Sequence, residues 1–233
     1  MQPLEPFYEK KLTCVFCGKL FTSLRVRSRF AIPYKTDSDF CPHYRSGNYN
    51  PHFYFVNVCP ECGFAFSEDF SDQFPNGTKE IIRVQITGNW TKRNFGQVRD
   101  IQQALESYKL AILAGSLKKE KNVVLAGLCL RLAWLYRSEN NAEQEKRFMG
   151  IALKAYEESF VLSDFGGTPM SEIRVLFMIG ELSRRLGQYQ KAVAYFSKVI
   201  QHKNAKDEQK IVNMVREQWR LTMEEKRQGT IED

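Results

Sequence analysis

The chain has 233 residues, of which 43% are hydrophobic, enough for one or two packed domains and too many for a disordered polypeptide. No stretch approaches the roughly 18 consecutive apolar residues of a membrane span, and the first residues lack the apolar centre of a secretory signal. The net charge is +7, and most of the excess lies after residue 90, which permits a nucleic-acid or acidic partner but is also typical of solvated helix faces.

The region up to about residue 74 is rich in aromatic residues, proline and glycine. Residues 20–34 alternate over several positions and residues 52–59 form a compact aromatic and β-branched run, so both are predicted to be strands. Residues 35–51 between them are crowded with the residues of turns. A small β-rich unit with one long excursion is expected, and the structure of residues 67–91 is left open.

Two Cys-x-x-Cys-Gly turns stand in this region, with the thiols Cys14, Cys17, Cys59 and Cys62. Zinc takes four thiolates at tetrahedral angles, and each tight turn aims two sulfurs at one point. The intervening segment, residues 18–58, exceeds the about 15 to 20 residues of compact sites. Lengthening a loop costs only about 0.6 kcal/mol per doubling, whereas structural zinc contributes on the order of 10 kcal/mol or more. We therefore predict a structural Zn²⁺ site in the reducing cytoplasm.

Two other readings of the paired turns are open. A dithiol switch needs a βαβ setting, which this region lacks, and an iron–sulfur cluster also takes four thiolates. Cys41 and His43, inside the excursion, are interpreted as an additional ligand, a reactive thiol, or a partly buried cysteine beside a surface histidine. Tyr44 and His52 stand nearby in the sequence, but no motif fixes the geometry of a nucleophile and its base. Cys129 is predicted to be a small core residue.

From about residue 97 the apolar period becomes helical. The stripes predict about six helices, at residues 98–112, 124–135, 149–160, 173–186, 192–200 and 211–223. The breaks between them are expected at Gly115 and Ser116, at Asn140 and Asn141, at residues 166–169, at Gly187 and near Asn204.

Small and aromatic residues recur along these helices. The sets are Ala104, Tyr108 and Ala111, then Ala152, Tyr156 and Ser159, then Ala192, Phe196 and Val199. Residues 176–200 resemble a tetratricopeptide repeat, with Gly180 for close helix contact, although the spacing of the sets is irregular. The predicted fold class is α+β, mostly α, with a zinc-binding β-rich domain at residues 1–90 and a tetratricopeptide-like helical array at residues 91–233.

Four stretches in order carry a family resemblance: LTCVFCGKLFTSLRVRSR, DSDFCPHY, VCPECGFAFSEDF and AGLCLRLAWLYR. The arrangement resembles the bacterial domain of unknown function 2225 and spans nearly the whole chain. The resemblance implies a cytoplasmic bacterial protein with a metal-binding front and a repeat-like helical back. It implies no known activity, and the family pattern includes the position of Cys41.

Three classes of function are weighed against each other. Stacked helix pairs build a concave surface for a peptide or partner helix, so the leading prediction is an adaptor that binds a protein. The candidate contacts are Arg131, Arg137, Arg174, Arg184 and Arg185, each of which is equally consistent with a solvated helix position. Catalysis on a small molecule is not predicted, because four-thiolate zinc has no open position and the chain has neither a phosphate loop nor a nucleophile elbow.

The alternative is RNA binding through a basic strand. Arg25, Arg27 and Arg29 alternate, which would place three guanidinium groups on one face, and Phe16, Phe21, Tyr34 and Tyr44 offer stacking surfaces. The opposing interpretation is that these arginines pair internally with Asp37, Asp39, Glu68 and Asp69.

Overall fold

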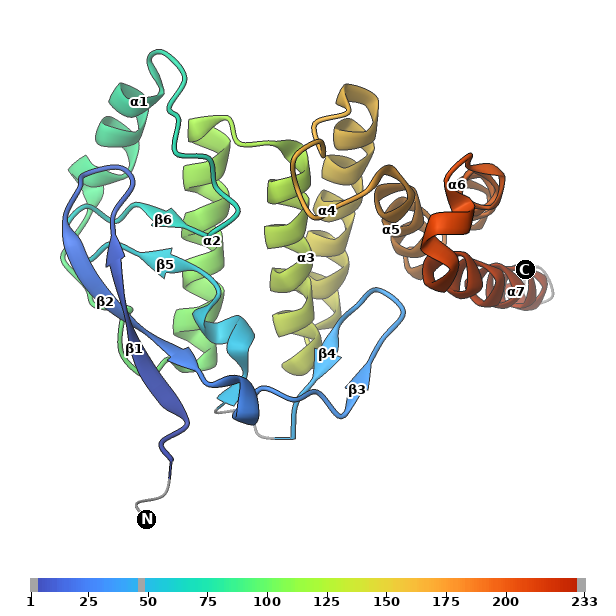
Figure 1. Cartoon of the computed structure of the whole chain (residues 1–233), viewed down its shortest axis with the longest axis horizontal. Helices are drawn as coiled ribbons and strands as arrows, with labels where there is room; N and C mark the ends of the chain where they lie inside the picture. Colours follow the sequence, from blue (N-terminus) through green and yellow to red (C-terminus); the bar gives the residue numbers. More distant parts are fainter. Residues whose placement is uncertain (1–3, 46–48, 230–233) are drawn as a thin grey trace. The chain divides into compact units, whose positions relative to one another are not determined.

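The computed structural model describes residues 4–45 and 49–229 (Figure 1). These residues divide into two compact units. The first unit holds the described residues up to Thr36 together with Pro42–Glu120 and Trp134–Asn140. The second unit holds Asp37–Cys41, Lys121–Ala133 and the chain from Asn141 onward. Each unit is therefore assembled from separate stretches of the sequence.

Short antiparallel strand pairs, two complete α-helices and the end of α3 (Asn122–Ser138), from Trp134 onward, form the first unit. Its elements are β1 (Phe7–Thr13), β2 (Leu20–Val26), η1 (Ser28–Phe30), β3 (Lys35–Thr36), β4 (Pro42–His43), η3 (Pro51–Tyr54), β5 (Asn57–Val58), β6 (Ala65–Phe66), α1 (Thr78–Gln85), η4 (Thr87–Asn89) and α2 (Ile101–Lys118). The pairs are β1 with β2, β3 with β4, and β5 with β6. The register of β1 and β2 runs from Phe7 opposite Val26 to Thr13 opposite Leu20.

The two strand predictions are partly wrong. The first strand ends at Val26 and is followed by the 3-10 helix η1. Most of residues 52–59 are not a strand, because Pro51 starts η3 and the Asn50 side chain accepts a hydrogen bond from the backbone N–H of His52 at 2.9 Å. This local cap outweighs the β-preference of the aromatic run, and only β5 remains of the expected strand.

Helix α2 runs through the expected break at Gly115 and Ser116, so that prediction is wrong. It begins with a capping box, in which Asp100 accepts from the N–H of Gln103 at 2.7 Å and the Gln103 side chain accepts from the N–H of Asp100 at 3.2 Å. Gly115 is buried within the helix, so packing overrides the low helix propensity of glycine.

The second unit is helical. Its elements are the part of α3 (Asn122–Ser138) up to Ala133, α4 (Ala142–Leu162), α5 (Glu172–Arg185), α6 (Tyr189–Gln201), η5 (Ala205–Glu208) and α7 (Gln209–Gly229). Asn141 caps α4 by accepting from the N–H of Gln144, and Ser171 caps α5 by accepting from the N–H of Arg174. The six predicted helices are confirmed, as are the breaks at Asn140 and Asn141, at residues 166–169 and at Gly187.

Helices α5 and α6 approach closely at Gly180. A Cβ on Gly180 would lie 2.6 Å from the ring of Phe196, and both residues are buried. The predicted role of Gly180 in close helix contact is therefore confirmed. No helix in the described ranges is both long and apolar enough to cross a membrane.

The predicted division of the chain near residue 90 stays a prediction. The compact units are cut at other places, since α2 belongs to the unit of the strand pairs and residues 37–41 belong to the helical unit.

Candidate metal centre

Each Cys-x-x-Cys-Gly sequence forms the turn of a strand pair. Between β1 and β2, the Cys14 N–H donates to the Lys19 carbonyl at 2.9 Å and the Gly18 N–H donates to the Cys14 carbonyl at 2.9 Å. The turn between β5 and β6 repeats this pattern, with Cys59 N–H to Phe64 O at 3.0 Å and Gly63 N–H to Cys59 O at 2.9 Å. The φ angles of Gly18 and Gly63 are 73° and 74°, the left-handed region that favours glycine.

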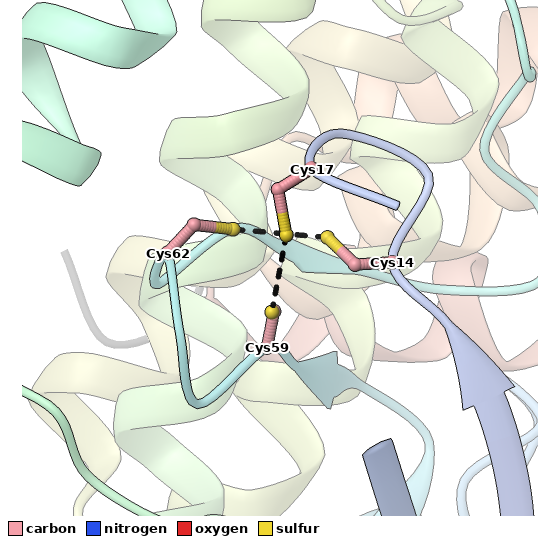
Figure 2. Close-up of side chains that lie close together, drawn as sticks. All are labelled: Cys14, Cys17, Cys59 and Cys62. Carbon is pink, nitrogen blue, oxygen red and sulfur yellow. Dashed lines mark hydrogen bonds between the residues drawn. The ribbon is translucent and has the colours of Figure 1, made fainter. Parts of the chain in front are cut away.

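These two turns bring the four predicted sulfurs together, as Figure 2 shows. All four sulfur atoms lie within 4.8 Å of one another. The Sγ atoms of Cys14 and Cys62 are 3.7 Å apart, and so are those of Cys17 and Cys59. A tetrahedron with zinc–sulfur bonds of about 2.3 Å has edges of about 3.8 Å, so the two measured separations fit such an ion. The cluster is compatible with a metal site.

The thiols of the cluster change one another's pKa values. A hydrogen bond with Cys59 raises the pKa of Cys14, a hydrogen bond with Cys14 raises the pKa of Cys62, and the pKa of Cys59 is lowered by its hydrogen bond with Cys14. Four sulfurs so close together cannot all lose their protons unless a cation compensates the repulsion of their charges. The donor set therefore suits a soft divalent cation.

The second turn is covered by a residue that sequence reasoning missed. The Trp90 indole N–H donates to the Pro60 carbonyl at 2.8 Å, and the Trp90 ring packs over Gly63. Lys92 adds an ion pair with Glu61 at 2.7 Å. Trp90 lies 30 residues after Pro60, in the stretch whose structure the sequence left open, so no local spacing indicates the contact.

Aromatic packing links the first turn to the second. The ring of Phe16, between the two cysteines of the first turn, stacks on Phe64 with centroids 5.4 Å apart. Phe64 follows the second turn directly and is fully buried. This contact holds the turns together in addition to the sulfur cluster.

A comparison with models of protein families identifies the family of this chain. A family model described as "Uncharacterized protein conserved in bacteria (DUF2225)" matches residues 7–222. The chain belongs to this family. The match covers both cysteine turns of the DUF2225 chain and extends into α7. No curated protein and no solved structure matches the chain.

The three arginines proposed for RNA binding do not share a strand face. Arg25 lies in β2, where its Nη2 donates to Asn57 at 2.6 Å and lies 3.9 Å from the carboxylate of Glu68. Arg27 follows the strand, and its Nε donates to the carbonyl of Glu5 at 3.0 Å. Arg29 lies in η1 and is exposed. Two of the three guanidinium groups are thus engaged within the DUF2225 fold.

The remaining cysteines stand outside the four-sulfur group. Cys41 is buried, and its N–H donates to Asp39 Oδ1 at 3.3 Å. Cys129 is buried in α3, where burial raises the pKa of its thiol to about 12. The prediction of Cys129 as a core residue is confirmed.

Buried charges in the helical unit centre on Glu181 of α5. Its carboxylate is fully buried and accepts from Arg184 Nη2 at 2.9 Å, from Arg185 Nε at 2.7 Å and from the hydroxyl of Ser38 at 2.6 Å. Arg185 also lies 3.5 Å from Asp39, which is fully buried. The expected partners of Asp39 were the front arginines, whereas the structure pairs it with an arginine of α5.

Beside Arg184 and Arg185 the helical unit has a surface hollow of about 540 Å³. Its lining comes from α4, from the end of α5 and the start of α6, and from α7; the residues are Ala142, Glu145, Lys146, Met149, Arg184, Arg185, Leu186, Gly187, Tyr189 and Glu225. Among the other arginines named as candidate contacts, Arg174 pairs with Glu208 at 2.9 Å and Arg131 donates to the Gly127 carbonyl at 3.0 Å; neither lines the hollow.

Proposed function

We propose that this DUF2225 protein is a zinc-stabilised, non-catalytic adaptor that binds a protein partner through its helical unit. The observation that carries the proposal is the hollow beside Arg184 and Arg185. It combines apolar side chains, such as Met149 and Leu186, with a tyrosine and several charged side chains. Aromatic residues, methionine and arginine are enriched at protein interfaces, and all three occur in this lining.

The helices that line the hollow support a repeat-like array. Helices α5 and α6 meet at Gly180 and Phe196, the small and aromatic residues that a tetratricopeptide-like pair uses for close contact. Arrays of such pairs use their shared surface to hold a peptide or a partner helix. We therefore assign the hollow, rather than any single exposed arginine, as the contact surface.

The proposed zinc has a structural role. Cys14, Cys17, Cys59 and Cys62 would fill all four positions of a tetrahedral ion, which leaves no position for water or substrate. The expected compartment is the cytoplasm, where a reducing environment keeps such thiols free for the metal. No small-molecule substrate is proposed.

The test is affinity capture from the native bacterial lysate with the full chain as bait. Lys146 is exposed at the hollow, and Lys146→Glu reverses its charge without touching the buried network. Lys154→Glu makes the same exchange at an exposed position of the same helix that does not line the hollow. We expect a protein partner that Lys154→Glu retains and Lys146→Glu loses by at least about tenfold, the effect of about 1.4 kcal/mol.

Each capture is run with and without nuclease. Recovery that vanishes with nuclease would favour the RNA-binding alternative through the arginines of the first unit. A partner that both charge variants bind equally would contradict the assignment of the hollow as the contact surface.

A further inference from the structure

We propose that Cys17 is an oxidation site of this protein. Of the four cysteines in the cluster, its thiolate is the one that a peroxide oxidises first. Cys14, Cys59 and Cys62 are buried, with exposed fractions of 1%, 0% and 4%, whereas Cys17 is exposed. The four thiols of one cluster therefore differ in their access to a reagent in water. Access and thiolate character together decide which cysteine reacts.

The surroundings of the two turns reinforce this difference. Over the second turn, the Trp90 ring fills the space in front of Gly63, at 2.5 Å from the position of a Cβ. At the equivalent glycine of the first turn, Gly18, a Cβ would meet no atom within 4 Å. A reagent can thus reach the first turn beside Gly18, next to Cys17, while Trp90 shields the second.

The structure also supplies a second thiol for the reaction. The Sγ atoms of Cys17 and Cys59 are 3.7 Å apart, so a disulfide between them needs the sulfurs to approach by less than 2 Å. In the first step the Cys17 thiolate attacks an oxygen of hydrogen peroxide; an S–O bond forms, the O–O bond breaks, and hydroxide leaves. In the second step the Cys59 thiolate attacks the sulfur of the Cys17 sulfenic acid; an S–S bond forms, the S–O bond breaks, and a second hydroxide leaves. The two thiolates lose two electrons in total, and the peroxide gains them.

This reaction removes one ligand from each turn. Cys14 and Cys62 remain, and two thiolates are too few for a closed tetrahedral zinc site. A bound metal would then be released, so oxidation at Cys17 would be coupled to the folding of the first unit. The proposal goes beyond the adaptor function and rests on the zinc centre proposed with it.

The experiment uses the full chain as purified, with its zinc content measured first. Limiting N-ethylmaleimide followed by peptide mapping should label Cys17 at least about tenfold faster than its three partners. Hydrogen peroxide with dimedone should trap a sulfenic acid at Cys17. Without dimedone it should give a Cys17–Cys59 disulfide and one released zinc per disulfide, read with a chromogenic chelator.

A double variant, Cys41→Ser with Cys129→Ser, is the matched control and should release zinc at the unchanged rate. If the Cys17→Ser protein retains zinc, peroxide should release that zinc at least about tenfold more slowly than from the unaltered chain. If it does not retain zinc, the peptide mapping of the unaltered chain tests the role of Cys17. First labelling or sulfenic acid at Cys14, Cys59 or Cys62 would overturn the proposal. A protein without zinc after purification contradicts the metal centre, whereas equal labelling of the four thiols in a zinc-loaded protein contradicts only the role of Cys17.

Discussion

The indole ring of Trp90 occupies the space that a side chain at Gly63 would need, with Cδ2 only 2.5 Å from the position of a Cβ. The same residue donates its indole N–H to the Pro60 carbonyl, so Trp90 contacts the second turn at both Pro60 and Gly63. This contact ties the segment after η4 to the second cysteine turn. It also distinguishes two turns that have nearly identical backbones.

The first prediction compares Gly63→Ala with Gly18→Ala. Both replace a glycine in the left-handed region, which costs about 1 to 2 kcal/mol for a residue with a Cβ. Only Gly63→Ala also displaces the Trp90 ring, so it should lose at least about 1 kcal/mol more of unfolding free energy, the lower range for overpacked sites. Urea denaturation and zinc competition measure the difference. Equal effects would mean that the Trp90 cover contributes nothing.

The second prediction concerns removal of the metal. The purified chain should hold one zinc ion, and a strong chelator or Cys62→Ser should unfold the strand pairs of the first unit. Trp90 should then leave its contact with Gly63 and shift its fluorescence to the red. Trp90→Phe is the control, because it removes this signal and leaves those of the other two tryptophans. A chelated protein with unchanged fluorescence and circular dichroism would contradict a structural zinc.

The third prediction tests the approach of α5 and α6. Gly180→Ala places a methyl group 2.6 Å from the Phe196 ring, so the helices must separate, at a cost of about 1 to 3 kcal/mol. Gly150→Ala in α4 meets no atom within 4 Å and should stabilise the protein by up to about 1 kcal/mol through helix propensity. Thermal unfolding of both variants supplies the comparison, and a neutral Gly180→Ala would argue against tight packing.

The fourth prediction concerns the buried carboxylate of Glu181. Glu181→Ala leaves Arg184 and Arg185 without their shared partner and should cost about 3 to 5 kcal/mol. Glu80→Ala removes an exposed pair with Arg83 and should cost no more than about 1 kcal/mol. Denaturation in guanidinium chloride distinguishes them. A small loss at Glu181 would show that water reaches the network.

The fifth prediction uses the raised pKa of Cys129. Burial raises it from the ordinary 9.0 to about 12, so the folded state holds the thiol proton at a pH where the unfolded state has lost it. The stability that this thiol contributes is therefore complete below pH 9 and falls as the pH rises toward 12. Cys129→Ala should show a shallower loss of stability between pH 9 and pH 10.5 than the unaltered chain. If stability fell with pH equally in the variant and in the unaltered chain, the Cys129 thiol would have to be in contact with water.

The helices and the cysteine turns could be predicted because each has a local pattern. The apolar period of α4 to α7 and the repeated Cys-x-x-Cys-Gly spacing are visible within a few residues of sequence. Gly180 was predictable for the same reason, since its neighbours carry the repeat. These features require no knowledge of distant contacts.

The errors arose where a cap or a distant contact decides the structure. Because Asn50 caps η3 and Pro51 begins it, a run that looks β-forming in the sequence is a 3-10 helix. Helix α2 continues beyond Gly115 because that residue is buried in the packed helix. Trp90 on Gly63 and Arg185 on Asp39 join residues far apart in the chain, and neither pair is marked by spacing. The three arginines do not share one strand as expected, because β2 ends at Val26, before Arg27 and Arg29.

The pairing of Ser38 with α5 has a consequence for synthesis on the ribosome. Ser38 precedes Arg185 by 147 positions. At roughly 5 to 20 residues per second, about 7 to 30 s pass between the synthesis of Ser38 and that of its partner Arg185. During that delay Asp39 must stay hydrated, so its burial is among the last events in the maturation of a newly made chain.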